Sequence, residues 1–151
     1  MKVTDIKIFP DYYTDKVCSE IQKHGRKEAI PVYRVGKYGQ NDHTAFLNYY
    51  DEVISGLKVV RNKEQFLEKC RDNIDQLSVS CYENIEDILN YFKITLKETH
   101  PNRILLQGVT VPECGISGRT RERKEKSTDS HVDWWLYRDV APYKYFEEVV
   151  I

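Results

Sequence analysis

The chain has 151 residues, of which 40% are hydrophobic and 31% are charged, and its formal net charge is −1. This composition excludes an intrinsically disordered chain and a membrane protein, and the length suits one domain over residues 1–151. A net charge near zero also argues against broad nonspecific binding of nucleic acid. None of the four cysteines forms a C-x-x-C pair, and the first residues contain no signal-peptide core. We therefore expect a cytoplasmic protein with reduced thiols, no metal site and no membrane association.

The predicted elements follow one another irregularly along the chain. In chain order, hydrophobic periodicity and the positions of Gly and Pro predict a strand over 3–9, a helix over 15–24, a strand over 30–35, a helix with an apolar stripe over 46–57, a helix over 62–70, a strand over 77–82, a helix over 84–96, a strand over 103–110, a loop over 112–129 and strands over 131–137 and 146–151. Regular βαβ alternation is absent. We therefore expect an α+β fold, with a mixed or antiparallel sheet of about six strands and about four helices.

One predicted strand carries the densest group of polar and aromatic side chains. Alternate side chains share a face of a strand, so His131, Asp133, Trp135 and Tyr137 fall on one side, and the residues between them pack into the core. His131 and Asp133 are candidate catalytic residues that contact one ligand, or a water between them. Trp135 and Tyr137 offer a stacking surface for a base or a nicotinamide ring. The alternative is a structural face covered by the long helix, with Asp133 holding a loop.

The loop before that strand has glycines and a local basic excess. Residues 119–126 contain five basic and two acidic side chains, so their local charge is 5 − 2 = +3. We predict that Arg119, Thr120, Arg121 and Arg123 bind phosphate, because guanidinium and hydroxyl groups donate hydrogen bonds to its oxygens. The glycine spacing matches neither a P-loop nor a dinucleotide fingerprint, and a solvated loop of turns is the alternative.

A third candidate group combines one arginine with two serines. Arg34 lies between apolar neighbours in a predicted strand, so it needs a protein carboxylate or an anionic ligand as partner. If the next predicted strand lies beside it, Ser78 and Ser80 face one cleft with Arg34 and with the histidine of the later strand. A structural ion pair of Arg34 with Glu147 or Glu148 is the alternative.

The same residues carry a resemblance to a known family. Tyr33-Arg34 in an early strand, Ser78 and Ser80 as a Ser-x-Ser before a predicted helix, and a late acidic Glu148 together resemble the ADP-ribosyltransferase fold. In that fold an Arg or His, a Ser or Tyr and a Glu surround NAD. The resemblance implies that Arg34 holds a phosphate of NAD and that Ser78 or Ser80 supports the nicotinamide ribose. It also implies that Glu148 is the catalytic residue that orients the attacking group, and that NAD is the cofactor.

Three functions remain open at this point. The leading hypothesis is a small cytoplasmic domain that binds a phosphate-bearing ligand, either a nucleotide or a nucleic-acid end, between the Gly108–Lys126 loop and the His131–Tyr137 strand. The second is a non-catalytic protein-interaction subunit or adaptor, of the immunity or anti-defence type of microbes or phages. It rests on 11 Tyr and two Trp, residues that are enriched at interfaces. The third is an ADP-ribosyltransferase-like enzyme that uses NAD, so whether the chain is an enzyme stays open.

Overall fold

The computed structural model describes residues 8–151, which form an α+β fold on one six-stranded antiparallel sheet, as the sequence predicts. The strands are β1 (Pro31–Gly36), β2 (Val79–Tyr82), β3 (Ile104–Val109), β4 (Gly115–Arg119), β5 (His131–Leu136) and β6 (Phe146–Val149). Their order across the sheet is β4-β5-β2-β1-β3-β6, and each neighbouring pair is antiparallel. Strands β2 and β1 are therefore central, β5 lies next to the edge strand β4, and β6 is the other edge.

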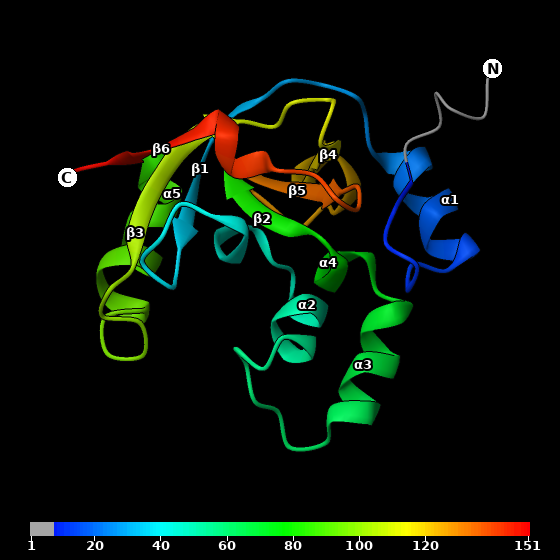
Figure 1. The fold of residues 1–151 in the computed structure, drawn as a ribbon. Coiled ribbons are helices and arrows are strands. Elements are labelled where there is room, and N and C mark those ends of the chain that lie inside the picture. Colours follow the sequence, from blue (N-terminus) through cyan, green and yellow to red (C-terminus); the bar gives the residue numbers. More distant parts are fainter. Residues whose placement is uncertain (1–7) are drawn as a thin grey trace.

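The helical segments lie on both faces of this sheet. They are α1 (Asp15–His24), η2 (His43–Phe46), α2 (Tyr49–Ile54), α3 (Lys63–Arg71), α4 (Ile74–Leu77), α5 (Ile85–Asn90), the π-helical η3 (Tyr91–Thr95), α6 (Thr120–Arg123) and η4 (Pro142–Tyr145). Figure 1 shows α1, α2, α3 and α4 grouped together, away from β3 and β6. Within residues 8–151, no helix has the length and apolar character needed to cross a bilayer.

Strand β5 is buried on both of its faces. Trp135 packs with side chains of α1, α2, α3 and α4, whereas Trp134 packs on the opposite face with residues of β1, β2, β3 and η2. Both tryptophans are 0% exposed. A third cluster joins Val35 and Leu105 to α5 and η3. A strand with core on both faces leaves little room for a ligand beside its side chains.

The prediction of a single long helix that carries the apolar stripe over 46–57 is wrong. The segment divides into η2 and α2 because two side chains start separate helical turns. Asp42 accepts a hydrogen bond from the Thr44 amide, and Asn48 accepts one from the Asp51 amide. The apolar stripe is shared between the two cores: Phe46 packs in the core around Trp134, whereas Tyr50 and Val53 pack with Trp135.

The loop predicted over 112–129 is also wrong, because it contains β4 and α6. Its glycines serve close strand packing. A Cβ on Gly115 would lie 2.3 Å from the Trp135 carbonyl oxygen, and one on Gly118 would lie 3.1 Å from the His24 carbonyl oxygen. At Gly115 only glycine allows this approach, so the pattern that indicated turns marks an edge strand instead.

The first predicted strand lies mostly outside the described residues. Of the range 3–9, the structure describes Ile8 and Phe9, and neither is in a strand. Phe9 stacks on Tyr13 with the ring centroids 5.2 Å apart. The sheet still has six strands, because β4 forms from the segment that was predicted to be a loop.

Candidate functional site

Strands β1 and β2 separate soon after they meet, and Arg34 fills the gap. The two strands pair at one position, Tyr33 with Tyr82. Arg34 Nε donates to the Ala45 carbonyl oxygen at 2.6 Å, and its Nη1 donates to the Ser80 carbonyl oxygen at 2.6 Å. The guanidinium thus donates hydrogen bonds to backbone carbonyl oxygens at a place where the two strands no longer pair through their backbone amides.

A cavity of about 220 Å³ opens at this separation, and we call it the β1–β2 cleft. Residues of α2 line one side of it, and residues of α5 and η3 line another. Its charged and hydroxyl-bearing lining comprises Arg34, Lys37, Glu52, Ser78 and Ser80, with the phenol rings of Tyr49, Tyr82 and Tyr91. The structure therefore places Arg34, Ser78 and Ser80 at one cavity. The sequence predicts this arrangement if the two strands are neighbours in the sheet. His131 is not among its lining residues.

The cleft has a net positive charge. Lys37 Nζ lies 3.4 Å from the buried Glu52 carboxylate, which also accepts a hydrogen bond from the Tyr38 hydroxyl. Arg34, by contrast, has no carboxylate within 4.0 Å in the described part of the chain. Its third hydrogen bond goes to the Leu47 carbonyl oxygen at 3.4 Å, so two of the five guanidinium N–H groups stay available.

The tyrosines give the cleft flat, uncharged walls. Burial raises the pKa of Tyr82 to about 12, and burial also raises the pKa of Tyr91 above its ordinary value. Both phenols are therefore neutral at physiological pH. Tyr49 is 42% exposed, and its ring lies 4.2 Å from Lys58 Nζ and 5.7 Å from Lys37 Nζ. The cleft combines cationic groups with aromatic faces that suit a planar ligand.

The predicted pair His131 and Asp133 lies close together, but protein groups bind His131 Nδ1 and both oxygens of the Asp133 carboxylate. Thr120 Oγ1 is 2.5 Å from His131 Nδ1 and donates to Asp133 Oδ2 at 2.7 Å. Ser78 donates to Asp133 Oδ1 at 2.8 Å, and Arg123 donates to Asp133 Oδ2 at 2.5 Å. Asp133 is 1% exposed, so a ligand reaches this carboxylate only by displacing a protein partner.

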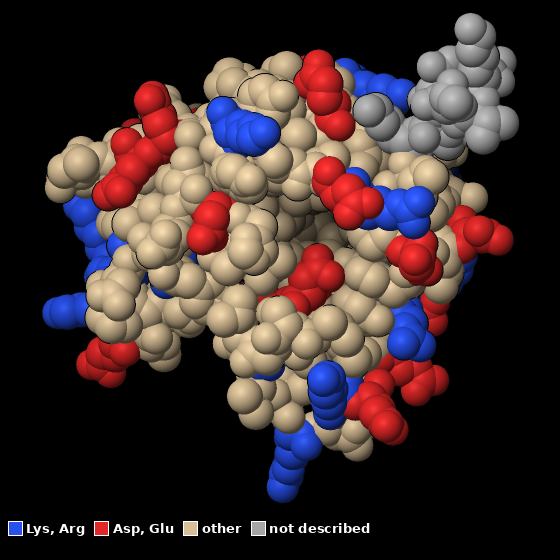
Figure 2. All heavy atoms as spheres, in the orientation of Figure 1, with Lys and Arg blue, Asp and Glu red and all other residues tan. Residues whose placement is uncertain are grey.

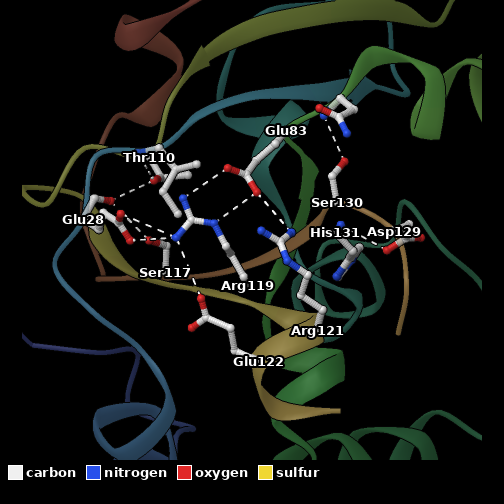
Figure 3. A network of polar contacts seen from close by, with 12 residues as sticks. Glu28, Glu83, Thr110, Ser117, Arg119, Arg121, Glu122, Asp129, Ser130 and His131 are labelled. Carbon is white, nitrogen blue, oxygen red and sulfur yellow. Dashed lines mark hydrogen bonds and ion pairs between the residues drawn. The ribbon is translucent and has the colours of Figure 1, made fainter. Parts of the chain in front are cut away.

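The predicted phosphate-binding arginines have carboxylate partners. Figure 3 shows Arg119 between Glu28 and Glu83, each 3.1 Å away, with Arg121 3.4 Å from the same Glu83 carboxylate. The hydrogen bond to Glu83 raises the pKa of Arg119 above its ordinary value. The local charge of +3 counted along the sequence is therefore compensated by acidic residues from other segments.

The network continues into the interior at Arg123. Its Nη2 lies 2.5 Å from both Asp75 Oδ1 and Asp133 Oδ2, and Lys124 Nζ lies 2.6 Å from Asp75 Oδ2. Burial alone would raise the pKa of the Asp75 carboxyl, but hydrogen bonds from Lys124 and Arg123 lower it below its ordinary value. We call the ion pairs of Arg119, Arg121, Arg123 and Lys124 the α6 network.

The prediction that Trp135 and Tyr137 form an exposed stacking surface is wrong, because both side chains are buried. Trp135 is 0% exposed, and its Nε1 donates to the Ile74 carbonyl oxygen at 2.8 Å. Tyr137 is 5% exposed and packs against Phe9, with the ring centroids 5.1 Å apart. Helices α1 to α4 cover this face, as the structural alternative for this strand expects.

Glu148 lies apart from the cleft. It is exposed on the edge strand β6, where the register places it beside Leu106, which in turn pairs with Arg34. Two strand spacings of about 4.8 Å therefore separate Glu148 from Arg34. The expected ion pair of Arg34 with Glu147 or Glu148 is wrong, because Arg34 binds backbone carbonyl oxygens instead.

Several cleft residues were missed by the sequence reading. Lys37 lies in a stretch predicted to be a turn, and the turn-like composition of that stretch gave no signal of burial. The sequence gave only a weak indication that Glu52 is buried, namely that it directly precedes Val53 of the apolar stripe. A charged residue at that position normally indicates the exposed face of a helix. Tyr49 and Tyr91 belong to helices whose packing only the tertiary structure sets.

Comparisons with protein-family models, with curated proteins and with solved structures found no match. The functional argument therefore rests on the geometry of the cleft.

Proposed function

We propose that this protein binds a small phosphate-bearing ligand of the nucleotide class in the β1–β2 cleft. In this proposal Arg34 and Lys37 contact the anionic group, and the tyrosine rings pack against the planar group. One observation carries the proposal: the half-buried Arg34 borders a cavity, has two unused N–H donors and lacks a carboxylate partner among residues 8–151. A guanidinium in such a position is suited to a bidentate contact with phosphate.

The size of the cleft limits the ligand. Sites for drug-sized molecules enclose about 300–1,000 Å³, and this cavity has about 220 Å³. A compact ligand, or one part of a nucleotide, fits that volume. A mononucleotide supplies the required combination, a doubly charged phosphate together with a flat ring for the aromatic walls.

A free nucleotide is favoured over a nucleic-acid end. Binding along a polynucleotide needs several unpaired basic side chains that follow the backbone, and the α6 network uses its basic side chains for protein carboxylates. The ligand site of the leading hypothesis therefore moves from the 108–126 segment to the β1–β2 cleft. The proposal keeps the expected cytoplasmic location, in which the cysteine thiols stay reduced.

The test is calorimetric titration of the full chain with AMP, NAD, inorganic phosphate and a 5′-phosphorylated short RNA. Arg34→Lys keeps the charge but removes the planar fork of donors, and Ser80→Phe places a ring at the exposed rim of the cleft. Arg121→Lys is the matched control, because that arginine lies outside the cleft. We expect AMP to bind, and both cleft variants to lose about tenfold or more in affinity.

The outcomes separate the alternatives. Binding of AMP that survives both cleft variants, or that Arg121→Lys abolishes, overturns the proposal, as does the absence of binding by every probe. Tighter binding of the RNA than of AMP points to a nucleic-acid end. Circular dichroism of each variant at the titration temperature shows whether it is folded, and Ser80→Phe keeps the test valid if Arg34→Lys unfolds.

The NAD-using enzyme is the second proposal, and the shared cavity of Arg34, Ser78 and Ser80 supports it. The position of Glu148 on the far edge strand speaks against it. Release of nicotinamide from NAD, lost in Glu148→Gln, would favour this proposal over simple binding. The adaptor hypothesis loses one of its supports, because both tryptophans are buried.

A further inference from the structure

A second cavity lies on the other side of the link between η2 and α2. Its volume is about 210 Å³, and Leu47 and Asn48 line both this cavity and the β1–β2 cleft. Its walls come from η2, α2, the start of β2 and the chain that follows β5. Figure 2 shows a hollow bordered by acidic side chains near the middle of the face, over the place where α2, α4 and the chain after β5 approach one another in Figure 1.

The cavity contains a carboxylate without a cation partner. Asp51, in the first turn of α2, accepts a hydrogen bond from the Tyr12 hydroxyl at 2.9 Å through Oδ1. No basic side chain of residues 8–151 lies within ion-pair distance of Asp51. Burial raises the pKa of the Asp51 carboxyl above its ordinary value, although the hydrogen bond from Tyr12 lowers it. A half-buried carboxylate that has no cation partner is stabilised when a cation binds beside it.

The rest of the lining is mixed, because it holds Asp139, His43 and Arg138 beside several apolar residues. Phe46, Leu136, Val140 and the ring of Tyr13 line the cavity. Arg138 also lines the cavity, and its guanidinium pairs with the exposed Asp11 carboxylate at 3.0 Å rather than with Asp51. An organic cation satisfies both parts of this lining, since its ammonium pairs with Asp51 and its apolar group contacts the apolar residues.

We propose that this cavity binds a small organic cation, a protonated primary amine on a compact apolar group, with its ammonium ion-paired to Asp51. The site is independent of the proposed nucleotide site. The consecutive carboxylates Asp51 and Glu52 of α2 line different cavities. Glu52 is paired with Lys37, whereas in this proposal a ligand supplies the cation for Asp51. The apolar walls select the body of the ligand, and Asp51 selects its charge.

The experiment compares benzylamine with benzyl alcohol, a neutral molecule of similar shape, by calorimetric titration in an amine-free buffer. We expect benzylamine to bind about tenfold or more tightly than benzyl alcohol. In Asp51→Asn that preference should disappear, because the amide keeps the size of the side chain and an acceptor for Tyr12 but removes the charge. The thermal stability of Asp51→Asn should equal or exceed that of the wild type, since an uncompensated buried charge is gone.

Two further variants locate the binding. Val140→Phe places a larger side chain in the cavity wall and should abolish binding of benzylamine, and it serves as the second variant if Asp51→Asn fails to fold. Ser80→Phe blocks the neighbouring β1–β2 cleft and should leave benzylamine affinity within about twofold of the wild-type value. Equal affinity for amine and alcohol, unchanged binding in Asp51→Asn, or no binding at all would overturn the inference.

Discussion

The β1–β2 cleft and the α6 network place arginines in opposite situations. Arg123 enters the interior and meets the carboxylates of Asp75 and Asp133, each 2.5 Å away. Arg34 enters between two strands and meets backbone carbonyl oxygens beside a cavity. The sequence shows a basic cluster around Arg123 and a lone arginine at 34, yet the lone arginine has donors left for a ligand. Local basic density is therefore a poor guide to an anion site when the carboxylate partners come from distant segments.

The largest effect that this comparison predicts is on stability, for Arg123→Ala. The change removes the guanidinium from the buried Asp133 carboxylate and leaves it the hydrogen bonds from Ser78 and Thr120. Removing one partner of a buried ion pair costs about 3–5 kcal/mol, and we expect a loss of this size in the free energy of unfolding measured with urea. A loss under about 1 kcal/mol would show that the pair behaves as a surface pair instead.

Arg34→Lys is expected to have an intermediate effect on stability together with the loss of ligand affinity. The substitution removes donors from the carbonyl oxygens of Ala45, Leu47 and Ser80. These hydrogen bonds are partly buried or exposed, so the loss of stability should lie at the low end of the about 1–3 kcal/mol that a buried acceptor without a partner costs, and thermal unfolding followed by circular dichroism measures it. Wild-type stability with lost ligand binding would assign Arg34 to the ligand alone. Lost stability with intact binding would assign it to the sheet alone.

Acid should weaken the α6 network through Asp75. Its pKa is lowered in the folded protein, so its contribution to stability is present above the unfolded-state value and is lost as the pH falls through the folded value. The wild type should therefore be more stable than Asp75→Asn at neutral pH, and the difference should shrink below about pH 4. Urea denaturation of both proteins across this range checks the prediction, which a difference independent of pH contradicts.

Arg121→Ala should have the smallest effect. The Arg121 side chain is 44% exposed, and its partner Glu83 keeps Arg119 at 3.1 Å. Exposed ion pairs contribute about 0–1 kcal/mol, so the melting temperature should change little. A larger loss would mean that the outer part of the α6 network is as tightly coupled as its buried end.

The sequence predicts the elements well where local signals agree. Helix α1 has its cap at Thr14, its buried residues Val17 and Ile21 and its end at Gly25, all of them local features. The predictions failed where a local pattern had two structural meanings. Gly115, expected in a turn, allows β4 to approach β5, and the residues of one apolar stripe pack into two different cores on either side of Asn48.

The candidate site was predictable only in part, for a similar reason. Arg34 was identified because a charged residue between apolar neighbours in a strand needs a partner, and Ser78 and Ser80 follow from strand adjacency. Lys37 and Glu52 come together from a turn and a helix, and no periodicity relates them. Ligand access to β5 could not be judged from alternation, because alternation does not reveal that both faces of a strand are covered.

By itself the sequence determined the α+β class, the main strands and the need of Arg34 for a partner, because periodicity, capping and the cost of burying a charge act over a few residues. The tertiary structure alone decided which basic side chains are neutralised, which cavity stays open and which carboxylate lacks a cation. These outcomes depend on pairs of groups from distant segments, and the energy of a charge depends on the partner that the fold places beside it.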